Sequence, residues 1–238
     1  YINQRDAEIL SQQKEKLFSP LFDTEDVMTA LEHIEEYSFN EMYEITQGIS
    51  FRFIPAGHIL FSAQTELYFS QANHNKKILF TSDLGNIQLS NNKLFVEKFQ
   101  PITNANIIIG ESTYGIPQKK SSQKLLKQDI DKIKAVVDQF CVDNKRRILI
   151  PCFALDRLPY MLWILYSLYG EDKGFKIPIC VDSPLGIRLL KAYHKNLPEE
   201  MLKNFNSMLS WEQIKYIEDP NDSKAAIADS SAKIVLAS

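Results

Sequence analysis

Apolar residues recur every three or four positions near the start of the chain. Val27, Leu31 and Ile34 follow this spacing, and Thr24 stands just before them with acidic residues behind it. Ser, Thr and Asp side chains cap helix N-termini, and acids in the first turn complement the helix dipole. The sequence therefore predicts helices in the first forty-odd residues, with Thr24 as an N-cap.

From residue 49 the pattern changes to alternation of apolar and polar residues, which is typical of strands. Alternating or apolar runs cover residues 49–53, 59–69 and 78–83, with a polar, turn-like stretch at 71–77. A fourth apolar run, Ile107–Gly110, ends on an acid. We expect a β meander followed by one more buried strand.

Helical spacing returns after Gly115. The apolar residues then recur at steps of four, three, four and three: Leu126, Ile130, Ile133, Val137 and Phe140. Strand-like runs at 147–151, 177–182 and 233–237 alternate with helical segments. This alternation predicts an α/β fold with a doubly wound parallel sheet, whose functional site lies at the C-terminal ends of the strands. The change of pattern predicts a domain boundary near residue 115.

Composition narrows the function classes only slightly. The 238 residues carry a formal net charge of −3, which gives no bulk preference for nucleic acid. Residues 1–47 hold eleven acids and three bases, whereas residues 118–147 hold nine bases and four acids. The basic segment is read either as a solvated helix face or as a phosphate-binding surface.

Three cysteines without metal-ligand spacing, the lack of an 18-residue apolar run and the lack of a secretory signal indicate a cytoplasmic protein without a membrane segment. Because the chain lacks an initial Met and ends on a strand, we expect a fragment of a longer protein.

Four residues are candidates for chemistry, each with a structural alternative. His58 in PAGHILFSA is a metal ligand or a hydrogen-bonded core residue. Asp83 is a bridging carboxylate or a turn-forming aspartate, and Glu111 orients a metal-bound histidine or caps a helix. Asp182 caps the helix that begins at Ser183 or Pro184, or that helix start holds a phosphate.

Other hydrolase and nucleotide-binding classes are excluded by their motifs. GESTYG has Tyr114 where a nucleophile elbow requires its second glycine. The chain also contains no G-x-G-x-x-G and no Walker loop.

Taken in order, AGHILFSA, LFTSDLG, IIIGESTYG, LIPCFALDR, VDSPLG and KIVLAS resemble the metallo-β-lactamase family of nucleic-acid hydrolases that carry a β-CASP domain. This group includes the cleavage and polyadenylation endonuclease and the RNase J relatives. The resemblance extends from about residue 50 to the end of the chain.

The resemblance implies that residues 1–115 form the C-terminal part of the metallo-β-lactamase domain, an αββα sandwich, and residues 116–238 the β-CASP domain. It further implies a ribonuclease with two zinc ions, where His58 binds one zinc, Asp83 bridges both, and Glu111 supports a catalytic histidine. Single-stranded RNA is the expected partner, and a homodimer is a further expectation. The expected substrate-binding residues are Asp182, Ser183, Lys119, Lys120 and Arg157.

The chain also departs from the family pattern. No H-x-H-x-D-H stands upstream of Phe53, and the paired histidines expected after KIVLAS lie beyond the sequence. Phe61, Ser82 and Asp156 occupy positions that are glycine in the family motifs. Two alternatives therefore stay open, a non-catalytic RNA-binding or scaffolding subunit and a metallo-β-lactamase hydrolase of small molecules.

Overall fold

A computed structural model describes residues 20–71, 74–85, 95–113 and 123–238 of the protein. The chain divides into two compact units, Tyr1–Glu41 and Met42–Ser238. None of the helices in these described ranges is long and apolar enough to cross a membrane.

The described part of the first unit contains one helix, α2 (Thr24–Glu32). Its N-cap is Asp23, whose carboxylate accepts hydrogen bonds from the backbone N–H groups of Glu25 at 2.8 Å and Asp26 at 3.1 Å. The Asp26 carboxylate accepts the Asp23 N–H at 2.9 Å, which completes a capping box. The prediction of Thr24 as the N-cap was wrong by one residue, because Asp23 has the extended backbone that a cap requires.

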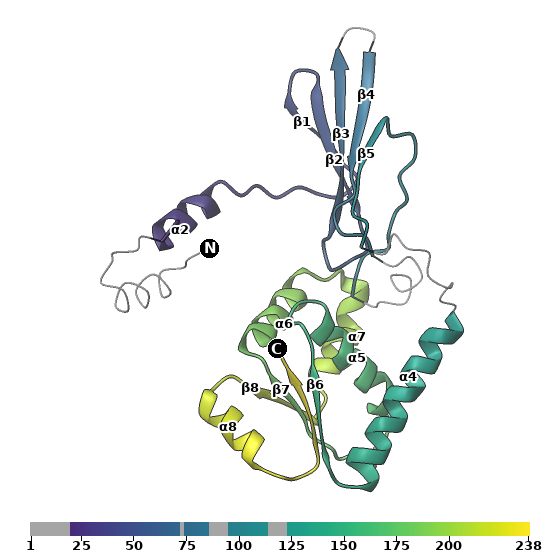
Figure 1. The fold of residues 1–238 in the computed structure, drawn as a ribbon, viewed down its shortest axis with the longest axis vertical. Helices are drawn as coiled ribbons and strands as arrows, with labels where there is room; N and C mark the ends of the chain where they lie inside the picture. The colour runs from purple at the N-terminus through teal and green to yellow at the C-terminus, as the bar shows by residue number, and fades with distance from the viewer. Residues whose placement is uncertain (1–19, 72–73, 86–94, 114–122) are drawn as a thin grey trace. The chain divides into compact units, whose positions relative to one another are not determined.

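The second unit begins with a five-stranded sheet (Figure 1). Its strands, in both spatial and chain order, are β1 (Met42–Thr46), β2 (Ile49–Pro55), β3 (Ala63–Gln71), β4 (His74–Phe80) and β5 (Ile107–Ile109). All neighbours are antiparallel except β4 and β5, which are parallel. The predicted meander is confirmed. Because β2, β4 and β5 run in the same direction, their C-terminal ends lie at one end of the sheet.

Two details of this sheet differ from expectation. The strand predicted over 59–69 begins at Ala63, because the chain first reverses through a turn in which the Ile59 carbonyl accepts the Ser62 N–H at 3.0 Å. The strand β5 is not buried, since its three isoleucines are 52–64% exposed. Among the described strands it pairs only with β4, at the edge of the sheet.

The rest of the second unit is a parallel α/β structure, which confirms the predicted α/β class. Its sheet has the spatial order β6 (Arg147–Pro151), β9 (Lys233–Ala237), β7 (Ile179–Asp182) and β8 (Ile214–Ile217), with every pair parallel. The helices are α4 (Gln123–Val137, continued by a π-helical segment Asp138–Asp143), α5 (Arg157–Tyr169), α6 (Pro184–Asn196), α7 (Glu199–Leu209) and α8 (Pro220–Ala228).

The core of this part lies between the sheet and its helices. Fully buried side chains come from α5, α7 and the central strands: Leu158, Leu162, Leu165, Phe205, Met208, Ile179, Val181, Ile234 and Leu236. Phe95, from the segment between β4 and β5, joins this core, with its ring centroid 5.6 Å from that of Trp163 and 4.8 Å from that of Phe205. The segment that connects two strands of the first sheet therefore packs against α5 and α7 of this part. The domain boundary expected near residue 115 lies outside the described residues and stays a prediction.

Each position at which a family glycine is replaced has a positive φ. The values are +62° at Phe61, +53° at Ser82 and +64° at Asp156. Residues with a Cβ adopt this region at a cost of about 1–2 kcal/mol, which glycine avoids. At each of these three positions the backbone therefore has a conformation that favours glycine.

We expect Ser82→Gly to raise the free energy of unfolding by about 0.5–1 kcal/mol, because it removes the strain of the Cβ at positive φ. Ser207→Gly is the matched control. Ser207 is exposed within α7, where glycine costs about 0.5–1 kcal/mol. Urea unfolding measures both values. A destabilised Ser82→Gly variant would contradict the argument from φ.

A buried ion network crosses β2, β3 and β4. The Glu66 carboxylate, 1% exposed, accepts hydrogen bonds from Arg52 Nε, Lys77 Nζ and the Tyr68 hydroxyl, each at 2.8 Å. Burial acts to raise the pKa of Glu66, but the donated hydrogen bonds outweigh it and hold the pKa below the ordinary value. The carboxylate is therefore ionised and bound on both oxygens.

The stability of the protein should depend on pH through this network. Because the folded pKa of Glu66 is lowered, its contribution is complete above the ordinary value of 4.5 and is lost as pH falls through the folded pKa. Glu66→Gln should cost about 3 kcal/mol at pH 7, since two cations lose their partner, and should flatten the fall of stability below pH 5. Urea unfolding between pH 3 and 7 measures this, with Glu44→Gln on exposed β1 as the control. An equal loss of unfolding free energy in both variants would contradict the role assigned to the Glu66 network.

Candidate active site at the strand ends

Three loops meet at one end of the first sheet. They follow β2 at Ala56–His58, β4 at 81–85 and β5 at 110–113. The Thr81 N–H donates to the Ile109 carbonyl at 3.0 Å, and the Gly85 N–H donates to the Ala56 carbonyl at 2.9 Å. The strand direction and these two bonds bring together the sequence motifs that contain His58, Asp83 and Glu111.

The first and second loops touch through their backbones at two glycines. A Cβ built on Gly85 would lie 1.8 Å from the Gly57 carbonyl oxygen, a distance that no side chain tolerates. Gly57 itself has φ +67°, and a Cβ there would lie 2.8 Å from the Phe99 nitrogen. Glycine at both positions is therefore a requirement of the close approach.

His58 is held by the turn that follows β2. Its backbone N–H donates to the Ser62 hydroxyl at 2.9 Å, and the Ile59 N–H donates to the same oxygen at 3.1 Å. The side chain is half-buried and close enough to Glu111 for its charge to lower the pKa of that carboxyl. Asp83 is exposed on the neighbouring loop, two residues before Gly85.

Glu111 connects the second and third loops. Its Oε1 accepts the Leu84 N–H and its Oε2 the Thr113 N–H, both at 3.0 Å, while its own N–H donates to the Thr81 hydroxyl at 3.3 Å. The pKa of Glu111 is lowered, mainly by the Thr113 hydroxyl, then by the two N–H donors and by His58. This side chain is therefore a fixed, ionised hydrogen-bond acceptor beside a histidine.

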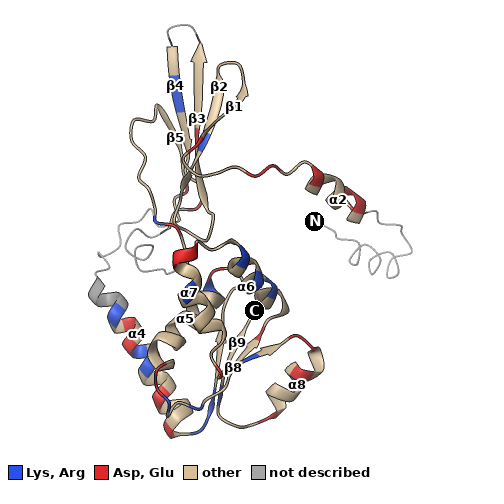
Figure 2. Cartoon of the chain, turned by 180° about the vertical axis from the view of Figure 1, so that it is seen from behind, with Lys and Arg blue, Asp and Glu red and all other residues tan. Residues whose placement is uncertain are grey.

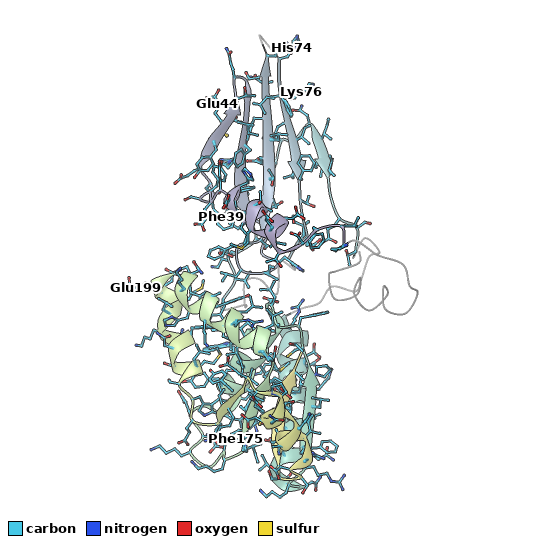
Figure 3. All side chains as sticks on the ribbon, turned by 90° about the vertical axis from the view of Figure 1, so that its left-hand side faces the viewer. Phe39, Glu44, His74, Lys76, Phe175 and Glu199 are labelled. Atoms are coloured by element: carbon cyan, nitrogen blue, oxygen red, sulfur yellow. The ribbon has the colours of Figure 1, made fainter. Side chains whose placement is uncertain are left out.

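His74 is excluded from this site by the direction of its strand. It begins β4, whereas Asp83 follows the end of the same strand, and Figure 3 shows His74 at the opposite end of the sheet. The turn-like stretch expected over 71–77 is shorter than predicted, because residues 74–77 belong to β4 and His74 pairs with Gln71 on β3.

Asp182 and Ser183 lie at the C-terminal edge of the second sheet, as the sequence predicted for that region. Ser183 is the N-cap of α6, with its hydroxyl accepting the Gly186 N–H at 2.9 Å, so the alternative of Asp182 as the cap was wrong. The Asp182 carboxylate instead accepts the Ser223 hydroxyl at 2.7 Å. The buried Ser183 hydroxyl also hydrogen-bonds to Ser238.

Arg157 lies at the start of α5 and is paired. Its Nη1 is 3.1 Å from the carboxylate of Asp156, which is 4% exposed. Sequence reasoning missed Asp156 as this partner, although an acid directly before a candidate phosphate-binding arginine is a readable signal. Lys119 and Lys120 lie outside the described residues.

A complete zinc shell is not assembled by the part of the chain that the structure describes. Within the described ranges, no three His, Cys, Asp or Glu side chains are grouped so that they could hold a metal ion. His58 and Asp83 supply two donors of suitable chemistry, whereas a structural zinc takes four ligands and a catalytic zinc three.

Comparison with known proteins identifies the class. Residues 160–238 match the Beta-Casp domain. The chain is 34% identical over 163 residues to an RNase J-like protein of Methanocaldococcus jannaschii, a match that covers 68% of this chain and 36% of the relative. It is 26% identical over 174 residues to Ribonuclease TTHA0252 of Thermus thermophilus, covering 73% and 37%.

A third similarity is to cleavage and polyadenylation specificity factor subunit 3-I of Arabidopsis thaliana, 30% identical over 175 residues, covering 73% of this chain and 23% of the relative. The match to the Beta-Casp domain and the similarity to proteins named as ribonucleases confirm the resemblance seen in the motifs. The chain spans a little over a third of the length of the first two relatives.

Gly85→Ala should disrupt this group of loops, because the new methyl group would collide with the Gly57 backbone rather than with a movable side chain. We expect a loss of about 2–4 kcal/mol in the free energy of unfolding. We also expect shifts in the backbone amide resonances of residues 56–58 and 111–113. The control is Gly174→Ala, where a Cβ meets only the Asp172 carboxylate, at 3.1 Å. Equal effects of the two variants would argue against the close contact.

Proposed function

We propose that this chain contributes one side of the active site of a metal-dependent phosphodiester hydrolase that cleaves RNA. The observation that carries the proposal is the meeting of the His58, Asp83 and Glu111 loops at one end of the sheet. The relatives named as ribonucleases or endoribonucleases support RNA as the substrate.

The proposed roles follow from the environment of each side chain. His58 and Asp83 would each give ligands to zinc, and the remaining ligands would come from residues outside the described ranges. A bound zinc ion lowers the pKa of water from 15.7 to about 7. Glu111 is ionised and fixed by two backbone N–H donors, so it can accept the N–H of an imidazole and hold that ring in one orientation.

The proposed RNA-binding side is the C-terminal edge of the second sheet. Asp182 ends β7, Ser183 follows it, and Arg157 begins the helix after β6, so all three lie at the edge where ligands of open α/β sheets bind. A guanidinium has five N–H donors, so the pairing of Arg157 with Asp156 does not exhaust it. Single-stranded RNA would meet a phosphate-binding group at this edge.

A second candidate is a non-catalytic RNA-binding or scaffolding subunit. The observation that favours it is the small number of metal donors in the described ranges, where no group of three is found. The two candidates predict the same RNA binding and differ in cleavage and in the response to metal.

The test is cleavage of a single-stranded RNA by the protein at its natural length. Asp83→Ala should lower kcat/KM at least about 100-fold, and EDTA should abolish cleavage, because the carboxylate is a proposed metal ligand. Asp131→Ala, an exposed acid on α4, is the control and should retain activity. The present 238 residues alone should bind fewer than two zinc ions and cleave no RNA, since two ligands do not complete two metal shells.

Cleavage that is insensitive to EDTA and unchanged in Asp83→Ala would contradict the metal mechanism. RNA binding without cleavage in the wild type would favour the non-catalytic subunit. Metal analysis that finds close to two zinc ions per chain would show that the described donors are not the whole set.

A further inference from the structure

The loop between β6 and α5 presents an aromatic ring to solvent. Phe153 is 80% exposed, the highest exposed fraction among the large hydrophobic side chains in the described ranges. Leu155, two residues on, is 42% exposed. Full burial of such a side chain would stabilise the fold by about 1.5–3 kcal/mol, and Phe153 does not contribute this stabilisation.

The loop holds this ring on a fixed backbone. The Cys152 N–H donates to the Ala237 carbonyl at 2.9 Å, and the Phe153 carbonyl accepts the Leu158 N–H at 3.0 Å. Phe153 is therefore tied on one side to the central strand β9 and on the other to the first turn of α5. Little conformational entropy remains for a ligand to remove from its backbone.

A strained turn completes the loop. Asp156 has φ +64° and ψ −52°, and the Arg157 N–H donates across it to the Leu155 carbonyl at 2.7 Å, which defines a γ-turn. This turn with positive φ is rare and costs about 1–3 kcal/mol, and such strain gathers at functional sites. It reverses the chain so that α5 begins at once, with the exposed Arg157 four residues after Phe153.

Two helices that begin at the same edge of the sheet as this loop carry basic but no acidic side chains. The helices α5 and α6 both begin at the C-terminal edge of the second sheet, and together they carry four Lys or Arg residues and no Asp or Glu. Figure 2 shows the basic residues of α6. The positive ends of both helix dipoles lie at the same edge. A polyanion with flat apolar rings matches this combination of charge and exposed aromatic surface.

We propose that Phe153 is a stacking platform for a base of single-stranded RNA, with Arg157 binding a neighbouring phosphate. The proposal rests on RNA being the substrate, as argued above. Each base offers a π face, so stacking on a fixed ring gives affinity without sequence preference, worth about 1–3 kcal/mol per base. The alternative occupant of this surface, a protein segment, would have no need of nucleobases.

Binding of a fluorescein-labelled ten-nucleotide oligouridylate by the whole 238-residue chain tests this, measured by anisotropy. Phe153→Ala should raise Kd about 5- to 150-fold. Phe153→Trp should retain affinity and gain an indole emission that RNA quenches. Leu149→Ala, 66% exposed on β6, is the matched control and should bind as the wild type does. Circular dichroism verifies that each variant is folded.

The salt dependence separates stacking from phosphate contact. Arg157→Ala should reduce the slope of log Kd against log salt by about 0.7, whereas Phe153→Ala should leave the slope unchanged. An oligonucleotide of abasic residues should bind wild type and Phe153→Ala equally. Wild-type binding of RNA together with unchanged affinity in Phe153→Ala would overturn the stacking proposal alone. Absence of RNA binding by the wild type would overturn both this proposal and the proposed substrate.

Discussion

The candidate site depends on a backbone contact between the loops after β2 and β4. Gly85 approaches the Gly57 carbonyl so closely that a methyl group at residue 85 would lie 1.8 Å from it. The backbones of the two loops are therefore in direct contact, with no room for a side chain between them. The Gly85 N–H donates a hydrogen bond to the Ala56 carbonyl. Glu111 adds the third loop through the Leu84 N–H. A histidine, an exposed aspartate and a fixed glutamate are thereby held at one end of a sheet.

The ion network of Glu66 also holds the candidate site together, through ion pairs between strands and not through a backbone contact. Glu66 lies on the central strand β3 and binds side chains from β2 and from β4, the two strands whose ends carry His58 and Asp83. An ionised carboxylate that is 1% exposed would be costly alone, but here three donors compensate for its loss of water. The network fixes the relative positions of the strands, and the glycine contact fixes the loops on top of them.

Three residues with a side chain adopt a backbone conformation that favours glycine. Phe61, Ser82 and Asp156 all have positive φ. They lie between β2 and β3, after β4 and directly before α5, respectively. At Asp156 the chain adds a compensating interaction, an ion pair between its buried carboxylate and Arg157. The surrounding hydrogen bonds decide the backbone conformation, and the residue at the position accepts the strain.

Periodicity and motif order by themselves determined the succession of elements, because the apolar residues that face the core recur with the period of the strand or helix on which they lie. They predicted the meander, the parallel α/β part, and His58, Asp83 and Glu111 as candidates. Local pattern could not decide that β5 is an exposed edge, since exposure depends on what pairs with a strand and not on its own residues. It also left the cap of α6 open between Asp182 and Ser183, a choice that the local backbone conformation makes. Nor could local pattern show that Gly57 and Gly85 are in contact or that Phe153 is exposed. These two outcomes depend on how segments far apart in the chain pack together, and only the tertiary structure fixes them.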